Sequence, residues 1–490
     1  MQQERLSLSK TKVVKFLHCE KKLWLSSYAE QQAAPSLDSH LQMQQGIEIG
    51  VVARALFPGG ILVTANQDCS PETQTKQLVE SNLGPIYEAA FVYEDTSVFI
   101  DILVPEEHGY HLIEIKAATK VSPHHITDTA IQMRVAEHAG LNVERVSVGC
   151  INNKFRYQGE GNYQGLIYLT DVTEATGELL EEVDEWFDSA RKVLARSEPL
   201  VEIGPQCVKP YKCEFERYCR SLIDDAPEYP LTDLKLPESR RRALESQGYV
   251  DALKTPPQLI ESPKKKRIHQ AILSGEPYVS KDAKKLVDEI PYPRYYLDFE
   301  TLTNALPLWN DSRPYEQVPF QWSCHIETAD NGLTHKEFLA SPGSDPRDSC
   351  SKALIELFDG FDGSMVAYNA GFEKRILQSL AKAYPSTRDL FERVSDRSFD
   401  LLPICREHFY HRYMHGSWSI KDVIPVIASD LNYSDLAVSN GRKAQEAYIE
   451  LLNGGLCEEE VKEIRTELLR YCGLDTLAMV RIARYFQAQR

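Results

Sequence analysis

Apolar and polar residues alternate along two neighbouring segments, residues 97–104 and 110–116, which the polar run 105–109 separates. Alternation with a period of two is typical of β-strands, and a short polar connection between two such segments predicts a hairpin. Within the second segment the alternation places Glu114 and Lys116 on one face. The pattern therefore predicts two paired strands that present an acid and a base on the same side.

A second apolar strand is predicted at residues 295–301, where two acids stand one residue apart. Because residues two apart in a strand point to the same side, Asp298 and Glu300 converge while Leu297 and Phe299 fill the opposite face. Much later in the chain comes a segment that contains Tyr471 and Asp475, which are four residues apart. Residues at this spacing share one face of a helix, so both side chains can approach the same site.

The pattern changes between these two regions, over residues 226–290. Prolines interrupt short helical segments there, and two basic runs occur at 240–242 and 264–267. We expect a helical connector, either with two short helices around a glycine turn that offer backbone amides and basic side chains to phosphates, or as a solvated linker. The linker is the preferred interpretation. In both, a positive connector can guide a nucleic-acid strand.

Composition limits the class of protein. The chain has 490 residues, of which 42% are hydrophobic; it has no apolar run near the ~20 residues that span a bilayer, so we expect no membrane partner. This length predicts two or three domains, and the polar N-terminus shows no signal peptide, so the expected location is cytoplasmic. A net charge of −17 argues against a passive coat of nucleic acid and favours an enzyme with local basic surface.

The acids near the C-terminus suit metal chemistry. Cleavage of a phosphodiester by two cations needs several hard oxygen ligands, and Asp298, Glu300 and Asp475 supply three carboxylates for Mg²⁺ or Mn²⁺. A fourth can come from Glu373, which follows a buried strand or helix entry. Asp400 is a competing donor that can equally cap a helix.

These motifs resemble those of the DnaQ-like DEDDy exonucleases over roughly residues 291–490. The resemblance implies an RNase H-like fold, 3'→5' action on nucleic acid, and a role for Tyr471 in orienting or deprotonating the attacking water. The family usually has Asp where this chain has Glu373. Ser419 and Lys421 are candidates for contacts to a terminal phosphate or ribose. Tyr315, Phe320 and Trp322 either stack on bases or pack in the core, and core packing is the simpler account.

Four of the eleven cysteines stand in a suggestive arrangement. An odd number of cysteines in a large chain that is expected in the cytoplasm argues against a disulfide framework. Three of them, Cys207, Cys213 and Cys219, are equally spaced in a short segment and are one short of a four-thiolate site. Cys19 is the candidate for the fourth ligand if the fold joins the two ends of the first domain. Four-cysteine sets bind iron–sulfur clusters and also zinc.

The predicted hairpin holds a second candidate site. An Asp followed by an acid and a lysine one residue apart, here Asp101, Glu114 and Lys116, can hold a divalent cation and place an ammonium beside a scissile phosphate. This is the PD-(D/E)XK pattern, and Gln132 fits the helical glutamine of RecB-like nucleases. Together with the cysteines, residues 1–225 resemble the iron–sulfur RecB-type nucleases of CRISPR adaptation and of the AddB recombination subunit.

This resemblance favours [4Fe–4S] over zinc for the four cysteines. It also suggests Glu48, on an amphipathic helix, as an additional residue near the metal; a place on the helix surface is an equal alternative. An isolated Glu-x-Lys would ordinarily be a solvated salt bridge. The ordered set of acids, lysine, glutamine and cysteines is what carries the resemblance.

End to end, the chain resembles a bacterial family that fuses an iron–sulfur RecB-like domain to a DnaQ-like exonuclease. The expected architecture is α/β with two nuclease domains, 1–225 and 291–490, joined by the connector. The expected activity is metal-dependent cleavage of DNA, with the first domain acting on single-stranded or unwound DNA and the second trimming 3' ends, in repair, recombination or defence against foreign DNA. Two alternatives remain open: RNA is the substrate, or one or both sites are inert and the protein only binds nucleic acid.

Overall fold

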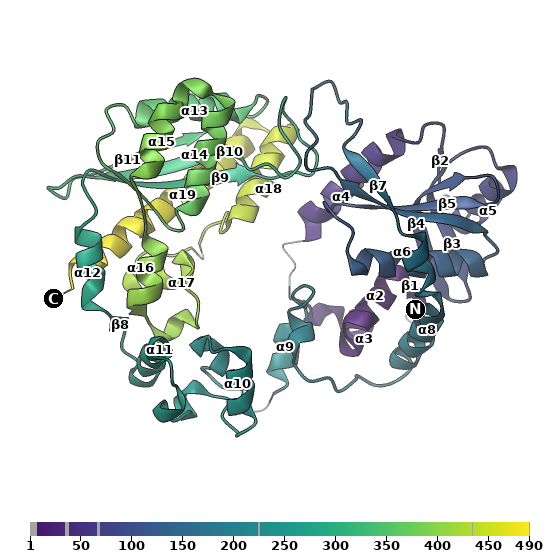
Figure 1. Cartoon of the computed structure of the whole chain (residues 1–490), viewed down its shortest axis with the longest axis horizontal. Coiled ribbons are helices and arrows are strands. Elements are labelled where there is room, and N and C mark those ends of the chain that lie inside the picture. The colour runs from purple at the N-terminus through teal and green to yellow at the C-terminus, as the bar shows by residue number, and fades with distance from the viewer. Residues whose placement is uncertain (1–6, 35–38, 66–68, 224–225, 434, 490) are drawn as a thin grey trace. The chain divides into compact units, whose positions relative to one another are not determined.

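The computed structural model describes residues 7–34, 39–65, 69–223, 226–433 and 435–489. The chain forms two compact units of mixed α/β structure (Figure 1). Unit 1 contains Met1–Asp224 and Asn304–Glu316, and unit 2 contains Asp225–Thr303 and Gln317–Arg490. The mixed α/β class expected from the sequence is confirmed, while the predicted boundary at residue 225 lies outside the described residues. In the described part of the chain, no helix is long and apolar enough to cross a membrane.

Unit 1 is built around a seven-stranded sheet in the order β2-β3-β4-β5-β6-β7, with β1 beside β4. The predicted hairpin is confirmed, because β4 and β5 are antiparallel neighbours, whereas β5 and β6 are parallel. The strands are β1 (Leu8–Ser9), β2 (Ile61–Leu62), β3 (Ile86–Tyr93), β4 (Thr96–Pro105), β5 (Tyr110–Lys116), β6 (Val143–Ile151) and β7 (Ile167–Asp171).

Helices cover both faces of this sheet. One face packs against α2, α6 and α8 in a large apolar cluster, and the other packs against α4 in a smaller one. The helices of unit 1 are α2 (Lys10–His18), α3 (Glu20–Tyr28), α4 (Ser39–Ala55), α5 (Pro71–Ser81), α6 (Pro123–His138), α7 (Thr173–Gly177), α8 (Leu180–Leu194) and α9 (Glu216–Ser221), with short 3₁₀ turns at Glu30–Gln32 and Pro205–Cys207.

Unit 2 is built around a five-stranded sheet in the order β11-β10-β9-β12-β13. The first three strands are antiparallel, and β12 and β13 continue the sheet in parallel with β9. A separate pair is formed by β8 and β14. The strands are β8 (Tyr278–Val279), β9 (Arg294–Leu302), β10 (Val318–Glu327), β11 (Leu333–Leu339), β12 (Ser364–Ala367), β13 (Ser398–Asp400) and β14 (Phe409–Tyr410).

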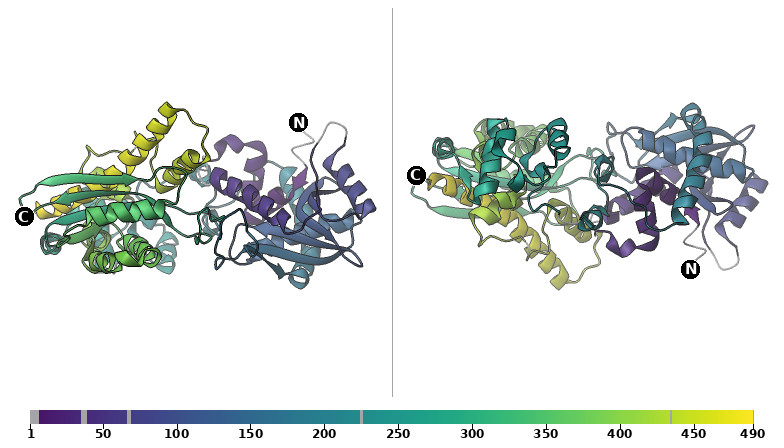
Figure 2. Two further views of the ribbon diagram at one scale, coloured as in Figure 1. Left: turned by 90° about the horizontal axis from the view of Figure 1, so that it is seen from above. Right: turned by 90° about the horizontal axis from the view of Figure 1, so that it is seen from below.

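The two faces of this sheet carry different helices (Figure 2). Leu297 and Phe299 of β9 join the apolar cluster formed with α13, α14 and α15, and the alternate residues of β9 face α19. The helices are α10 (Glu238–Glu245), α11 (Pro263–Ser274), α12 (Lys281–Asp288), α13 (Pro346–Leu357), α14 (Gly371–Ala383), α15 (Arg388–Asp396), α16 (Leu401–His408), α17 (Ile420–Ile427), α18 (Gly441–Asn453) and α19 (Glu458–Gln487). Short 3₁₀ turns lie at Leu231–Leu234, Ala252–Lys254, Pro257–Leu259, Pro385–Thr387 and Arg412–Met414.

Residues 226–290 are not the solvated linker that we preferred from the sequence. Leu234, Leu244 and Ile260 are fully buried, and β8 pairs with β14 of unit 2. The sequence pattern did not predict these buried positions. The apolar residues are scattered among several short helices, so they do not repeat with the regular spacing of one long amphipathic helix. The segment is therefore a folded part of unit 2.

Residues 304–316, which connect β9 to β10, belong to unit 1. Ala305 is fully buried in the apolar cluster of α4 and the hairpin. The amide of Tyr157 donates to the carbonyl of Ser312 at 3.1 Å, and the amide of Asp311 donates back to the carbonyl of Tyr157 at 2.8 Å. Residues 304–316 thus follow directly on β9 of unit 2 but fold as part of unit 1.

The aromatic residues considered for base stacking lie mostly in the core. Phe320 and Trp322 are 0% and 3% exposed, and Phe320 stacks on Tyr448 with ring centroids 4.1 Å apart. Tyr315 packs against the smaller apolar cluster of unit 1. Core packing, the simpler account, is confirmed for Phe320 and Trp322.

Candidate metal centres

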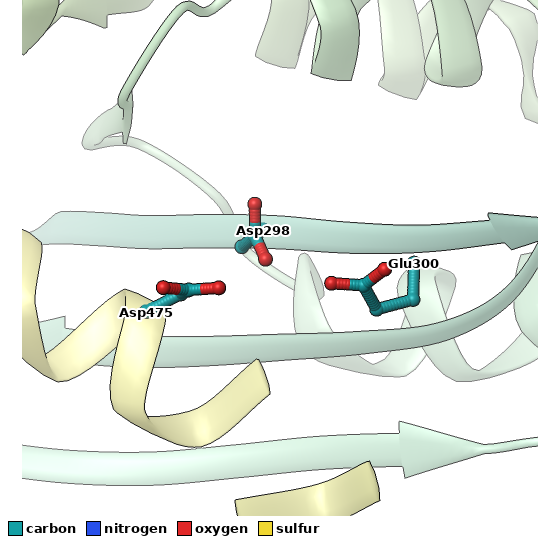
Figure 3. A group of neighbouring side chains, drawn as sticks. All are labelled: Asp298, Glu300 and Asp475. Carbon is teal, nitrogen blue, oxygen red and sulfur yellow. The ribbon is translucent and has the colours of Figure 1, made fainter. Parts of the chain in front are cut away.

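Three carboxylates of unit 2 converge on one point (Figure 3). Each of Asp298, Glu300 and Asp475 offers one oxygen that lies within 4.8 Å of the oxygens offered by the other two. The first two come from β9, where the spacing of two residues puts them on the side opposite Leu297 and Phe299. Asp475 comes from the middle of α19, which packs on that side of the sheet.

The electrostatics of this group favour an added positive charge. Burial raises the pKa of Asp298 well above its usual value, and the neighbouring charge of Asp475 raises it further. Burial and the charges of Asp298 and Asp475 do the same to the pKa of Glu300. The charge of Lys421 lowers the pKa of all three without offsetting these shifts, and among the described residues no lysine or arginine forms an ion pair with them. Three acids at this distance with no paired base are suited to a divalent cation.

Two tyrosines and a lysine border the group. The hydroxyl of Tyr433 donates to Asp475 Oδ1 at 2.5 Å. Lys421 Nζ donates to the hydroxyl of Tyr471 at 3.1 Å and to the carbonyl of Ser439 at 2.7 Å. Burial raises the pKa of Tyr471, and the nearby carboxylates raise it further. Tyr471 therefore stands beside the three acids, where the spacing of four residues from Asp475 predicted it. Tyr433 carried no signal in the sequence.

Glu373 and Asp400, the two candidates for a fourth carboxylate, differ in their partners. Glu373 lies in the first turn of α14, is 2% exposed, and has a buried oxygen, Oε2, that no donor contacts. Burial raises its pKa well above the usual value, and the charge of Asp298 adds to this shift. Asp400 instead accepts from the amides of Leu402 and Asn369, both at 2.9 Å, as a helix cap does.

The structure thus separates these two candidates. The capping interpretation holds for Asp400, while Glu373 keeps an oxygen available near Asp298. Glu373 is outside the group whose oxygens lie within 4.8 Å of one another. The unpartnered buried oxygen fits a fourth ligand for a second cation, because a buried carboxylate without donors is costly unless a cation or proton neutralises it.

The second group of predicted residues converges in unit 1. Glu114 Oε1 accepts from Lys116 Nζ at 2.8 Å and from Lys10 Nζ at 2.6 Å. Its other oxygen, Oε2, accepts from Gln132 Nε2 at 2.6 Å. Asp101 Oδ2 accepts from the backbone amide of Ile115 at 2.6 Å. All four predicted residues, from β4, β5 and α6, therefore lie together.

The pKa values of the two acids of this site, Asp101 and Glu114, are shifted in opposite directions. Burial and the charge of Glu114 raise the pKa of Asp101 to about 8. Burial alone would also raise the pKa of Glu114, but the charges of Lys10 and Lys116 outweigh it and lower the value to about 2. The structure keeps Glu114 ionised, and it leaves Asp101 in need of a cation or a proton at neutral pH.

Sequence reasoning missed two charged partners of this site. Lys10, at the start of α2, is 104 positions from Glu114 in the chain, and nothing in its local pattern distinguishes it from a surface lysine. Asp128, one turn before Gln132 on α6, pairs with Lys116 Nζ; its spacing of four residues from Gln132 was the available signal.

Glu48 and Gln132 differ in how they relate to the site. Glu48 is exposed on α4 and accepts from Gln44 at 3.3 Å, which agrees with the helix-surface alternative. Gln132 is fully buried, and its amide nitrogen donates to Glu114 and to the carbonyl of Phe99. Its oxygen, Oε1, has no partner. An acceptor is therefore left open beside the two acids.

The four predicted cysteines all line one cavity. Cys19 lies between α2 and α3, and Cys207, Cys213 and Cys219 come from the segment before and within α9. The cavity is lined by these four residues together with Lys21, Lys22, Leu25, Val201, Glu202, Ile203, Gln206, Phe215 and Glu216.

The spacing of the sulfur atoms bears on the kind of group that would fit. In the described part of the chain, no three of these thiols lie within 4.8 Å of one another. A single zinc ion with Zn–S bonds of about 2.3 Å would need sulfur atoms about 3.8 Å apart. A [4Fe–4S] cluster holds its thiolates farther apart, because each binds a different iron. No three of these thiols therefore have the spacing that a single zinc ion requires.

Comparison with known proteins gives similarity but no activity. The profile of the family described as "Domain of unknown function (DUF2779)" matches residues 295–419. The match includes Asp298, Glu300 and Glu373 and ends before Tyr471 and Asp475.

Three curated relatives come from mollicutes. The chain is 24% identical over 212 residues to "Uncharacterized protein MG366" of Mycoplasma genitalium, covering 40% of this chain and 32% of that protein. It is 25% identical over 224 residues to "Uncharacterized protein MG366 homolog" of Mycoplasma pneumoniae, covering 42% and 33%. It is 24% identical over 216 residues to "Uncharacterized protein UU173" of Ureaplasma parvum, covering 39% and 31%. The chain spans about a third of the length of these relatives.

Proposed function

We propose that unit 2 is a metal-dependent 3'→5' exonuclease of DNA with an RNase H-like fold of the DnaQ type. The convergence of Asp298, Glu300 and Asp475 within 4.8 Å, without a paired base, is the observation that carries this proposal. The sheet order, with three antiparallel strands extended by parallel β12 and β13, is compatible with that fold. The acids stand on the central strand β9 and on the helix that covers it.

In this proposal Asp298, Glu300 and Asp475 would hold Mg²⁺ or Mn²⁺, with Glu373 as the fourth ligand. The cations supply charge stabilisation for the attacking and leaving oxygens of the phosphodiester. Tyr471 positions the attacking water through its hydroxyl. Lys421 fixes that hydroxyl by its own hydrogen bond, and Tyr433 fixes the carboxylate of Asp475 in the same way.

Unit 1 is proposed as a second nuclease, of the RecB-like PD-(D/E)XK type. Asp101 and Glu114 would hold a divalent cation there, and Lys116 would place its ammonium beside the scissile phosphate. Asp128 holds Lys116 from its far side, and Gln132 orients Glu114. The substrate is single-stranded or unwound DNA, and the biological setting, by analogy alone, is repair, recombination or defence against foreign DNA.

The cysteine cavity is proposed to hold a [4Fe–4S] cluster. In the sequence, Cys19 lies near the start of the segment that forms unit 1, and Cys219 lies near its end. A cluster bound to both would link these two parts of the chain. The test is the iron, sulfide and zinc content of protein purified without oxygen, for the wild type and Cys213→Ser. Cys457→Ser, at an exposed cysteine of unit 2, is the control. We expect iron and sulfide in equal amounts, lost only in Cys213→Ser; zinc in their place would contradict the cluster.

Nuclease activity is tested with 5'- and 3'-labelled single-stranded DNA, and with RNA of the same sequence, in Mn²⁺ or Mg²⁺. Asp298→Ala should abolish 3' trimming, and Lys116→Ala should remove the cleavage that persists in Asp298→Ala. The matched controls are Asp430→Ala, at an exposed acid of unit 2, and Lys120→Ala, at an exposed lysine that follows β5. Faster cleavage of RNA would change the substrate, and binding without cleavage would show that the sites are inert.

A further inference from the structure

The strand registers of unit 1 bring Glu88, Asp101 and Glu114 to the same level of neighbouring strands, although among the described residues their oxygens do not form a group within 4.8 Å of one another. Tyr87 of β3 pairs with Ile102 of β4, and Ala89 pairs with Ile100, so Glu88 stands opposite Asp101. On the other side of β4, Ile102 pairs with Ile113, and the next position in this register sets Asp101 opposite Glu114. Adjacent strands β3, β4 and β5 thus each contribute one acid at the same level. Like charges directly opposite one another destabilise a sheet, so this row requires compensation.

The strands are distorted at this level. Glu88 has a φ of +55°, which lies in the left-handed region that residues other than glycine rarely adopt. Ile86 and Ala89 lie in the same apolar cluster although they are three residues apart. The regular alternation of faces is therefore interrupted at Glu88. Ile100 and Leu103 show the same interruption across Asp101 on the neighbouring strand.

The side chain of Glu88 is only loosely held. Among the described residues its one ion pair is to Arg54 Nη2 at 3.6 Å, and the side chain is 38% exposed. Its charge raises the pKa of Asp101, and its own pKa is raised by burial and by Glu114 and lowered by Arg54 and Lys10. A weak, half-exposed pair with Arg54 does not account for an acid placed beside two others in a strained conformation.

A second observation at this site concerns the buried side chain of Gln132. Gln132 is fully buried, donates its amide nitrogen to Glu114, and leaves Oε1 without a partner. An open buried acceptor next to a row of acids fits a bound cation or its water, because each would supply the positive charge or the donors that these oxygens lack.

We propose that Glu88 is a third carboxylate ligand of a divalent cation held at Asp101 and Glu114. The inference rests on the cation site proposed for unit 1 and adds a ligand from a third strand. Lys10 and Lys116 already neutralise Glu114, so the charge left for the cation comes mainly from Asp101 and Glu88.

The test measures Mn²⁺ binding rather than activity. Full-length protein carrying Asp298→Asn and Asp475→Asn, which remove ligands of the unit 2 site, is titrated with Mn²⁺, and free Mn²⁺ is followed by electron paramagnetic resonance. Glu88→Gln and Asp101→Asn are added in turn. The control is Glu94→Gln. Glu94 also has a left-handed backbone, lies in the turn between β3 and β4, and pairs with an arginine, Arg191, at 2.9 Å.

We expect Glu88→Gln to weaken Mn²⁺ binding about 10-fold or more, Asp101→Asn to weaken it at least as much, and Glu94→Gln to leave it unchanged. If Asp101→Asn weakens binding and Glu88→Gln does not, Glu88 is not a ligand while the proposed site stands. If Asp101→Asn also has no effect, the cation site of unit 1 itself is wrong.

Stability distinguishes a ligand from a structural residue. Without metal, Glu88→Gln removes one of three neighbouring negative charges, so the thermal midpoint should stay unchanged or rise. The increase in that midpoint on adding Mn²⁺ should become smaller than in Glu94→Gln. A lower midpoint without metal, together with an undiminished increase on adding Mn²⁺, would assign Glu88 a purely structural role through Arg54.

Discussion

Glu114 of unit 1 and Glu300 of unit 2 are the same residue type, stand on central strands, and are 3% and 7% exposed. Their pKa values nevertheless move in opposite directions. Burial raises both, but Lys10 and Lys116 bring the pKa of Glu114 down to about 2, whereas Asp298 and Asp475 raise that of Glu300 further. Burial sets the cost of a charge, and the sign of the neighbours decides whether the charge persists.

The comparison implies that the two sites depend on metal to different degrees. Lysines inside the fold already compensate most of the negative charge near Glu114. The charge of Lys421 acts on the acids around Glu300 but does not offset their burial, so their pKa values stay raised and a cation from solution would favour their ionised form. Five predictions test this difference.

The largest effect is expected for Asp475→Asn. It removes one of three carboxylate ligands from a site whose acids form no ion pair with a lysine among the described residues, although the charge of Lys421 acts on all three. Loss of about 3–4 kcal/mol of transition-state stabilisation corresponds to about 10²–10³-fold slower 3' trimming. The rate is measured on 3'-labelled DNA, with Asp430→Asn as the control. If the rate of 3' trimming fell by less than tenfold, Asp475 would not be a metal ligand.

A smaller loss is expected for Lys116→Met in unit 1. Glu114 then keeps only Lys10 as a charged partner, so its pKa should rise from about 2, and the phosphate loses its neighbouring ammonium. Cleavage that persists in Asp298→Ala should slow about 10²-fold. The readout is its rate between pH 6 and 9, compared with Lys120→Met. Wild-type rates across this range would mean that Lys116 is a structural partner of Asp128.

Stability without metal should change in opposite directions for the same substitution in the two sites. Glu114→Gln leaves two lysines without their buried partner and should destabilise unit 1 by roughly 3–5 kcal/mol. Glu300→Gln removes a repelled charge and should stabilise unit 2, with a rise of roughly 2–4 °C in the melting temperature per kcal/mol. Melting in EDTA at pH 8 measures both. Shifts of equal sign would contradict the comparison.

The pH dependence of these shifts follows from the two pKa directions. The pKa of Glu300 is raised in the folded protein, so ionisation costs stability as pH rises; the gain from Glu300→Gln should be present at pH 8 and vanish on acidification below about 4.5, its unperturbed pKa. The pKa of Glu114 falls from 4.5 to about 2, so its contribution is present above 4.5 and is lost as pH falls through 2. The deficit of Glu114→Gln should shrink over that window.

The smallest effect is expected for Asp400→Ala, which tests the ligand set of unit 2. Asp400 caps α16, so its loss should cost about 1 kcal/mol of stability and leave trimming unchanged. Glu373→Gln should slow trimming with little loss of stability. Denaturant unfolding and 3' trimming, measured on both variants, separate the two roles. The opposite pattern would make Asp400 the fourth carboxylate.

Local periodicity was enough to predict part of both sites. The period of two in β5 and β9 correctly placed Glu114 beside Lys116 and Asp298 beside Glu300. The spacing of four in α19 kept Asp475 and Tyr471 on one face. Each of these placements depends only on the geometry of a single element, which the sequence encodes directly.

Contacts between distant elements were beyond such reasoning. Lys10 meets Glu114 only because α2 packs across the sheet, and Tyr433 meets Asp475 from an irregular segment. Glu88 was hidden for another reason: its strand breaks the alternation from which faces are inferred. The buried positions within 226–290 are likewise set by partners elsewhere in unit 2, whereas the local pattern showed only prolines and charge.

The loop of residues 304–316 has a consequence for how the two halves of this chain can be inherited. It begins directly after the strand that carries Asp298 and Glu300, yet its Ala305 is buried only in the presence of residues 1–224. A gene segment encoding residues 226–490 alone would transfer the carboxylates together with a loop whose apolar residues are no longer buried by unit 1. We therefore expect the two halves to be exchanged between genomes as a pair, and expression of the second half alone to yield aggregated protein.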